Sequence, residues 1–214
     1  MIGIYGGTFN PVHYGHLRTA LEVKELFELE QLRLIPCRLP PHRDEPEVPA
    51  EIRLQMLEAA VADTPGFSVD RRELDRAGPS YMVETLQSLR EELGREVSLL
   101  LFIGADAFAG LAGWYQWQHL FDYAHVVVMT RPGFSGQALP EFLQQRCART
   151  GEQLRRQAAG YLYFQEVTAL AISATEIRQL LAVGHNPQFL LPDSVIALIR
   201  RYQLYQAPIH YTGN

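Results

Sequence analysis

The 214-residue chain has only two cysteines, Cys37 and Cys147, which stand far apart and form no Cys-x-x-Cys pair. Their number and spacing suggest neither a disulfide framework nor a zinc site. No apolar run reaches the roughly 18 residues that a transmembrane helix needs, and no basic segment with a cleavage site precedes the first apolar stretch. We therefore expect a cytoplasmic protein without a membrane partner.

The chain also has no excess of positive charge: it contains 19 lysines and arginines and 24 acidic residues, and its formal net charge is −5. Broad nucleic-acid binding usually requires a basic excess, so we expect no nucleic-acid partner. The positive charge that an anionic ligand needs must then be local. With 47% hydrophobic and 20% charged residues, the composition is that of a globular domain, and it does not decide between a monomer and a homo-oligomer.

Apolar runs and amphipathic stretches alternate along the chain, which predicts the α/β class with an open parallel sheet and helices on both faces. We expect a single domain over residues 1–205, including C-terminal helices, followed by a tail at 206–214, and a solvated helical excursion at 139–159. The predicted strands are 1–6, 32–36, 67–69, 97–103, 124–130 and 161–167, and the predicted helices are 14–30, 52–62, 81–93, the segment between Ser173 and Gly184, and 193–202.

The stretch Gly6–His16 connects the first strand to the first helix at the edge of the sheet where ligands bind in such folds. Gly6 and Gly7 allow backbone amides to approach a ligand or to adopt positive φ, and the helix start offers unpaired N–H groups. His13 and His16 lie on one face of that start and can donate to the same anion. His16 could instead be a core histidine that binds no ligand, because it begins an apolar stripe typical of a core-facing helix.

A second anion-binding pattern occurs late in the chain, at Ile172–Arg178. Ser173 and Glu176 have the spacing of a capping box, which any helix can begin with. Thr175 and Arg178 add a hydroxyl and a guanidinium to the same first turns. Together they favour a cradle for a polyphosphate.

Other loops at the same edge carry residues with a functional and a structural interpretation. His42 and Arg43 lie on a proline-rich loop that is either part of the site or a solvated loop with incidental charge. Gly104 and Asp106 follow a strand and could hold a ribose or a hydrated metal, or Asp106 could cap the next helix. The aromatic cluster within 113–117, formed by Trp114, Tyr115 and Trp117, could stack on a flat ring or serve packing alone. Arg131 begins an exit loop.

This inventory, with no obvious nucleophile, suits nucleotidyl transfer. The attacking phosphate oxygen is already ionised near neutral pH, so no general base is needed, and catalysis consists of positioning and charge neutralisation. Gly6–His16 matches the H-x-x-H element of the nucleotidyltransferase superfamily, and Ile172–Arg178 matches its second phosphate element. With the segments 40–43, 79–81, 104–106, 114–115 and 131–133, residues 1 to about 205 resemble the bacterial nicotinate mononucleotide adenylyltransferases.

The resemblance implies a Rossmann-like fold and transfer of the adenylyl group of ATP to nicotinate mononucleotide, giving deamido-NAD and pyrophosphate, with Mg²⁺ carried by ATP and no protein metal ligands. It implies His13, His16 and Arg178 as catalytic residues. The implied ATP-binding residues are Gly6, Gly7, Thr8, Phe9, His13, His16, Gly104, Asp106, Ile172, Ser173, Thr175 and Arg178. The implied nicotinate mononucleotide-binding residues are His42, Arg43, Tyr81, Val83, Thr85, Trp114, Tyr115 and Arg131.

Within that set, Trp114 would stack on the pyridine ring, and backbone amides near Val83 and Tyr115, with Thr85 nearby, would receive its carboxylate. Position 10 is Asn where many members carry Asp, and position 43 is Arg where many carry Lys. Three alternatives remain open: another acceptor such as nicotinamide mononucleotide or phosphopantetheine, a nucleotide-binding module without turnover, and a structural α/β scaffold.

Overall fold

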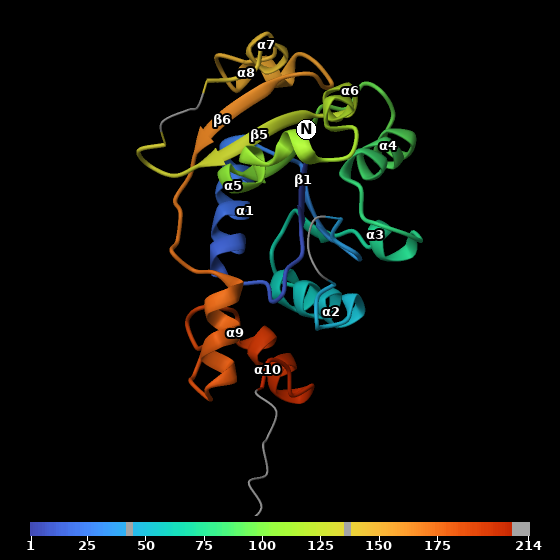
Figure 1. Ribbon diagram of the computed structural model, residues 1–214. Coiled ribbons are helices and arrows are strands. Elements are labelled where there is room, and N and C mark those ends of the chain that lie inside the picture. Colours follow the sequence, from blue (N-terminus) through green and yellow to red (C-terminus); the bar gives the residue numbers. More distant parts are fainter. Residues whose placement is uncertain (42–44, 135–137, 207–214) are drawn as a thin grey trace, which may run out of the picture.

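A six-stranded parallel sheet organises the computed structural model, which describes residues 1–41, 45–134 and 138–206 (Figure 1). The strand order is β3-β2-β1-β4-β5-β6. Successive strands are added on one side of β1 up to β3 and on its other side from β4 onward, so the order reverses between β1 and β4 while all strands stay parallel. Ligands of open α/β sheets bind outside the carboxyl ends of the strands at such a reversal. The strands are β1 (Ile2–Gly7), β2 (Gln31–Pro36), β3 (Phe67–Val69), β4 (Leu99–Gly104), β5 (His125–Thr130) and β6 (Leu162–Glu166).

Helices connect these strands and extend the chain beyond β6. The longer ones are α1 (Tyr14–Leu26), α2 (Ala50–Val61), α4 (Met82–Leu93), α9 (Ala174–Ala182) and α10 (Asp193–Arg201). Short helices are α3 (Arg72–Asp75), α5 (Ala105–Ala109), α6 (Leu120–Tyr123), α7 (Glu141–Gln144), α8 (Glu152–Arg155) and the 3-10 turns η1 (Leu111–Gly113) and η2 (Trp117–His119). In the described ranges, no helix is long and apolar enough to cross a membrane.

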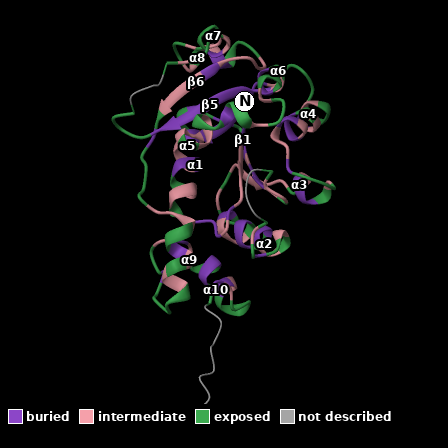
Figure 2. Ribbon diagram, viewed as in Figure 1, coloured by how far each residue is buried: buried purple, intermediate pink, exposed green. Residues whose placement is uncertain are grey.

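Alternate residues of the central strands face opposite sides of the sheet, and each side carries its own apolar core. Along β4, Leu100 and Phe102 join the core that α1 and α2 cover, whereas Leu99 and Leu101 join the core that α4 and α6 cover. Figure 2 shows the buried positions gathered on the strands and on the helix faces turned toward them. The predicted α/β fold with helices on both faces is confirmed.

Helices α9 and α10 form the end of the molecule furthest from α7 and α8 (Figure 1). Val195, Ile196 and Ile199 of α10 are buried in the core that α1 and α2 cover. Ser194 also donates a hydrogen bond to the carbonyl of Ala59 in α2, at 2.9 Å. These contacts hold the C-terminal helices against the first half of the sheet, beside the β1–α1 connection.

Three local predictions are corrected by the structure. The first helix ends at Leu26 rather than at residue 30, because Glu28 adopts a φ of 49° and turns the chain toward β2. Ser80 does not cap α4; its Oγ accepts a hydrogen bond from the Arg38 N–H at 2.9 Å instead. Segment 139–159 is not a solvated excursion, because its single-turn helices bury Leu143 and Leu154. The expected boundary at residues 205 and 206 stays a prediction.

Candidate active site

The two histidines are in close contact where the β1–α1 connection meets α1, because His13 precedes the helix and His16 lies in its first turn. His13 is only 5% exposed and occupies the position before the first turn of α1 with an extended backbone. Its ring centroid lies 3.8 Å from that of His16, at an interplanar angle of 32°. His16 also begins a stripe that continues through the buried Ala20 and Val23, so its helix face is core-facing as well. The functional and the structural interpretation of His16 are therefore compatible.

Burial keeps both imidazoles neutral. It lowers the pKa of His13 to about 4 and that of His16 to about 3, the latter with a smaller contribution from repulsion by His13. Within the described part of the chain, neither Nδ1 atom has a hydrogen-bond partner, although both are buried. Buried polar atoms left unpaired cost free energy and need an explanation, often a functional one. Since the Nδ1 side is sealed, Nε2 is the nitrogen that each ring can offer to a ligand.

Gly15 allows this arrangement of the rings. A Cβ atom at Gly15 would lie 2.9 Å from Nδ1 of His13 and 3.2 Å from the carbonyl oxygen of Ile172. The glycine therefore stands where α1, the His13 ring and the segment before α9 meet. Of the two alternatives for Gly6 and Gly7, positive φ is excluded, because both residues belong to β1, and close approach to a ligand stays a prediction. The left-handed residue of the loop is Phe9, with a φ of 46°.

The second phosphate-type motif reaches the first one through Arg178. Its Nη1 donates to the Asn10 carbonyl at 2.8 Å, and its Nη2 lies 3.3 Å from Thr175 Oγ1. The predicted cap of α9 is confirmed, because Ser173 Oγ accepts from the Glu176 N–H at 3.2 Å. Residues 168 positions apart thus meet at the loop that carries His13 and His16.

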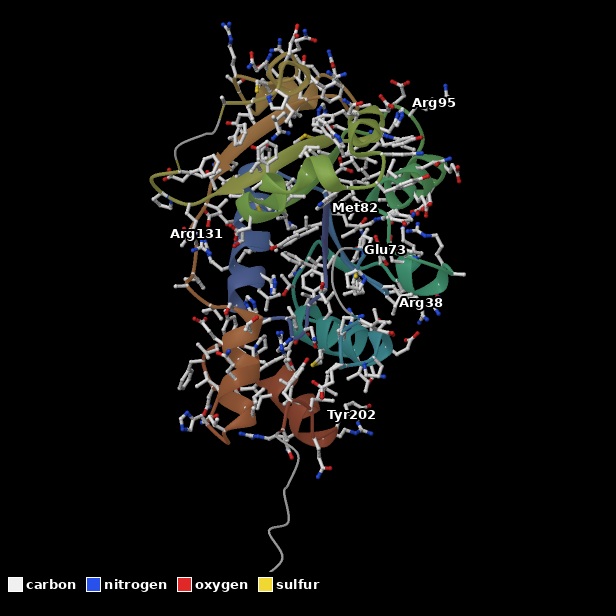
Figure 3. All side chains as sticks on the ribbon, viewed as in Figure 1. Arg38, Glu73, Met82, Arg95, Arg131 and Tyr202 are labelled. Atoms are coloured by element: carbon white, nitrogen blue, oxygen red, sulfur yellow. The ribbon has the colours of Figure 1, made fainter. Side chains whose placement is uncertain are left out.

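The carboxyl ends of β4 and β5 place further predicted residues at the same edge of the sheet. Gly104 ends β4 with no atom within 4 Å of a Cβ built on it. Asp106 is exposed in the first turn of α5 and makes no capping hydrogen bond, so the capping alternative is wrong. Arg131 is exposed directly after β5, on the opposite side of β1 from Arg38 and Glu73 (Figure 3).

The residues predicted around the pyridine ring come together only in part. The rings of Tyr81 and Tyr115 lie 4.5 Å apart, and Trp114 packs partly buried against the core beneath α4. The side chains of Val83 and Thr85 are buried, and the Thr85 hydroxyl donates to Oε1 of Glu73 at 2.7 Å. A ligand at the start of α4 would therefore meet backbone rather than these side chains. His42 and Arg43 lie outside the described residues.

Sequence reasoning missed three residues that support these loops from beneath. Arg53 is 1% exposed and donates to the Thr8 carbonyl at 2.7 Å. Glu73 is buried under the start of α4, and burial raises its pKa. Tyr205 donates to Oδ1 of Asn10 at 2.6 Å. The signal for Arg53 and Glu73 was a charge on the apolar face of a helix, but the pattern alone does not name the partner.

The fold and this site define the class of the protein. The sequence model of the cytidylyltransferase-like family matches residues 4–180. The nicotinic acid mononucleotide adenylyltransferase of Plasmodium falciparum complexed with NaAD superposes with a TM-score of 0.71 at 17% identity, covering 95% of this chain and 96% of that chain. The same protein complexed with APC gives 0.68 at 16% identity, with the same coverage. The fold is that of a Rossmann-like nucleotidyltransferase.

Curated relatives narrow the class further. A protein of Methylococcus capsulatus named "Probable nicotinate-nucleotide adenylyltransferase" is 52% identical over 96% of this chain and 99% of its own length. Proteins of the same name from Halorhodospira halophila and Pseudomonas putida are 54% and 49% identical, covering 91% and 97% of this chain and 90% and 95% of their own lengths. The chain belongs to the cytidylyltransferase-like family and, within it, to the nicotinate-nucleotide adenylyltransferases.

Proposed function

We propose that this chain transfers the adenylyl group of ATP to nicotinate mononucleotide, giving nicotinate adenine dinucleotide and pyrophosphate in NAD biosynthesis. The observation that carries the proposal is the meeting of Arg178 with the loop of His13 and His16, through the Asn10 carbonyl. Cationic and N–H donors from both ends of the chain then converge at the carboxyl edge of β1, where a triphosphate would lie.

The chemistry requires positioning rather than a nucleophile on the protein. The phosphate oxygen of the acceptor mononucleotide attacks the α-phosphorus of ATP, and the bond to the bridging oxygen of pyrophosphate breaks. Nε2 of His13 and His16 would donate to the phosphate oxygens, and Arg178 would stabilise the charge on the departing pyrophosphate. Neutral imidazoles suit this role, because a donor N–H is present on each ring without prior protonation.

Magnesium would enter with ATP. In the described ranges, no cluster of three His, Cys, Asp or Glu side chains could hold a metal ion. Asn10 lies in the middle of the β1–α1 connection, residues 8–13, which we call the phosphate loop. It accepts a hydrogen bond from Tyr205 through its side chain and one from Arg178 through its carbonyl. Mg²⁺ held by the triphosphate oxygens would neutralise part of their charge.

The acceptor would lie on the other side of β1, at the start of α4. Met82 is adjacent to the phosphate loop there, since a Cβ built on Gly6 would lie 2.5 Å from its Cε. Backbone N–H groups in the first turn of this 12-residue helix, near Val83, would receive the pyridine carboxylate. Tyr81 and Tyr115 would line the ring beside Trp114. A site built from neutral donors favours the acid over the amide mononucleotide.

The decisive experiment compares acceptors with the purified protein, ATP and Mg²⁺. Nicotinate mononucleotide, nicotinamide mononucleotide and phosphopantetheine are each incubated with the enzyme, and the dinucleotide product and pyrophosphate are quantified. We expect the highest kcat/KM with the nicotinate form. A higher value with either other acceptor would change the substrate assignment, and ATP binding without pyrophosphate release would indicate a binding module.

The role of the histidine pair has its own test. Replacing His16 by Ala removes one preorganised donor and should lower kcat roughly 10²-fold. Because His16 also contributes to packing, the variant must retain a cooperative thermal transition for the comparison to count. Full activity in a folded His16→Ala protein would contradict the assigned role.

A further inference from the structure

Arg53 of α2 is a buried cation at the base of the phosphate loop. Its Nη1 donates to the Thr8 carbonyl at 2.7 Å, its Nη2 to the Arg38 carbonyl at 3.2 Å and its Nε to the Val48 carbonyl at 3.1 Å. The side chain is 1% exposed, and within the described residues no carboxylate pairs with it. A buried charge is retained at a cost in desolvation, which the three carbonyl dipoles offset here.

The Thr8 carbonyl that Arg53 holds determines where the next N–H points. In a planar trans peptide, the carbonyl of one residue and the N–H of the following residue point in opposite directions. The only cis bond of the described chain joins Asn10 and Pro11, so the Thr8–Phe9 peptide is trans. With its carbonyl directed toward α2, the Phe9 N–H is directed away from α2. In the described part of the chain, no hydrogen bond uses this N–H.

The backbone of Phe9 needs such support. Its φ of 46° lies in the left-handed region that side-chain-bearing residues rarely adopt. A strained conformation persists only when the surroundings hold it. Arg53 holds the peptide before Phe9, and Arg178 holds the Asn10 carbonyl after it, at 2.8 Å.

We propose that Arg53 is a positioning residue for the adenylyl transfer reaction, which orients the Phe9 N–H as a donor to the triphosphate by fixing the Thr8 carbonyl. It does not touch the substrate itself. The same guanidinium also donates to the carbonyls of Arg38 and Val48, so it ties the phosphate loop to both ends of the β2–α2 connection. The inference rests on the proposed function for the identity of the ligand.

Arg90 of α4 provides a matched control. Its guanidinium also holds backbone carbonyls, those of Tyr123 at 2.7 Å, Gly94 at 3.2 Å, and Val97 and Ala158. These residues lie before β4, β5 and β6, at the edge of the sheet opposite the site. Arg90→Lys should therefore lower the stability of the fold as Arg53→Lys does, but it should leave the KM for ATP unchanged.

The test measures kinetics and amide exchange on the full chain. In the wild type, ATP with Mg²⁺ should slow hydrogen exchange of the Phe9 amide. Arg53→Lys retains the charge but not the planar fork, and we expect about a tenfold or larger rise in KM for ATP or fall in kcat/KM, with weakened protection of the Phe9 amide. Arg90→Lys should retain both wild-type values.

Several outcomes would overturn the proposal: a folded Arg53→Lys enzyme with unchanged kcat/KM, an equal kinetic defect in Arg90→Lys, or a Phe9 amide that ATP does not protect in the wild type. The last measurement needs no variant, so it can overturn the proposal even where Arg53→Lys fails to fold. If ATP protects the Phe9 amide and Arg53→Lys weakens that protection, but no acceptor is adenylylated, the proposed function fails while the role of Arg53 in orienting the Phe9 N–H toward ATP stands.

Discussion

At the scale of single residues, the pair His13 and His16 couples the site to pH. Their pKa values of about 4 and about 3 lie below the ordinary 6.5, because burial disfavours the charged ring. The unfolded chain therefore binds protons at a higher pH than the folded chain does. Stability is complete above about pH 6.5 and decreases as the pH falls toward the folded-state values.

This predicts a specific difference between the wild type and His16→Gln. At pH 5 an unfolded histidine is protonated while His16 is still neutral, which removes on the order of 2 kcal/mol of stability relative to pH 7. Urea unfolding at both pH values should show a correspondingly smaller loss in His16→Gln. Equal losses in the two proteins would mean that His16 titrates normally.

At the scale of elements, the contact of α1 with the segment before α9 depends on a missing side chain. Gly15 lets the His13 ring and the Ile172 carbonyl approach α1, and a Cβ there would lie 2.9 Å and 3.2 Å from them. An added methyl group would therefore have to displace the buried ring or the backbone segment that leads into α9. The packing of α1 against this segment therefore contributes to the placement of the histidines relative to α9.

Gly15→Ala should consequently lower kcat/KM by about tenfold or more, since a displacement on the order of 1 Å in a positioning site has effects of that size. Gly151→Ala is the matched control, because its Cβ would make an ordinary contact at 3.5 Å with Phe27, far from the site. Steady-state kinetics and thermal melting of both variants check the prediction. Equal activity of the two variants would show that α1 accommodates the methyl group.

At the scale of the whole molecule, the two ends of the chain close on one another. Tyr205 lies 195 residues from Asn10, and its hydroxyl donates to Oδ1 of Asn10 at 2.6 Å. Arg178 reaches the carbonyl of the same residue. The C-terminal part of the chain therefore supports the β1–α1 connection that leads to His13, although it follows the last strand.

Tyr205→Phe should destabilise the protein by about 1 kcal/mol, because Asn10 loses its partner in a largely buried position. We also expect a higher KM for ATP. Tyr202→Phe is the control, since Tyr202 donates to Gln55 in an exposed setting at 2.9 Å. Denaturant unfolding and ATP titration of both variants distinguish a general effect of removing a hydroxyl group from a specific effect on the β1–α1 connection around Asn10.

The sequence by itself determined the order of the strands and of the longer helices, the candidate anion motifs near both ends of the chain and the cap of α9. These features are local: strand and helix periods, glycine, and capping residues act over a few positions. Whether Gly104, Asp106, Arg131 and the tyrosines contact a substrate stays a prediction.

Only the tertiary structure decided which groups meet. The carbonyl partners of Arg53, the link from Arg178 and Tyr205 to Asn10, the neutral state of the histidines and the burial of Thr85 depend on packing between distant segments. A sequence pattern encodes which face of a helix is apolar, but not which backbone carbonyl or carboxylate will oppose a charge on it. That choice follows from the order of strands in the sheet and the seating of α2, α9 and α10 against it.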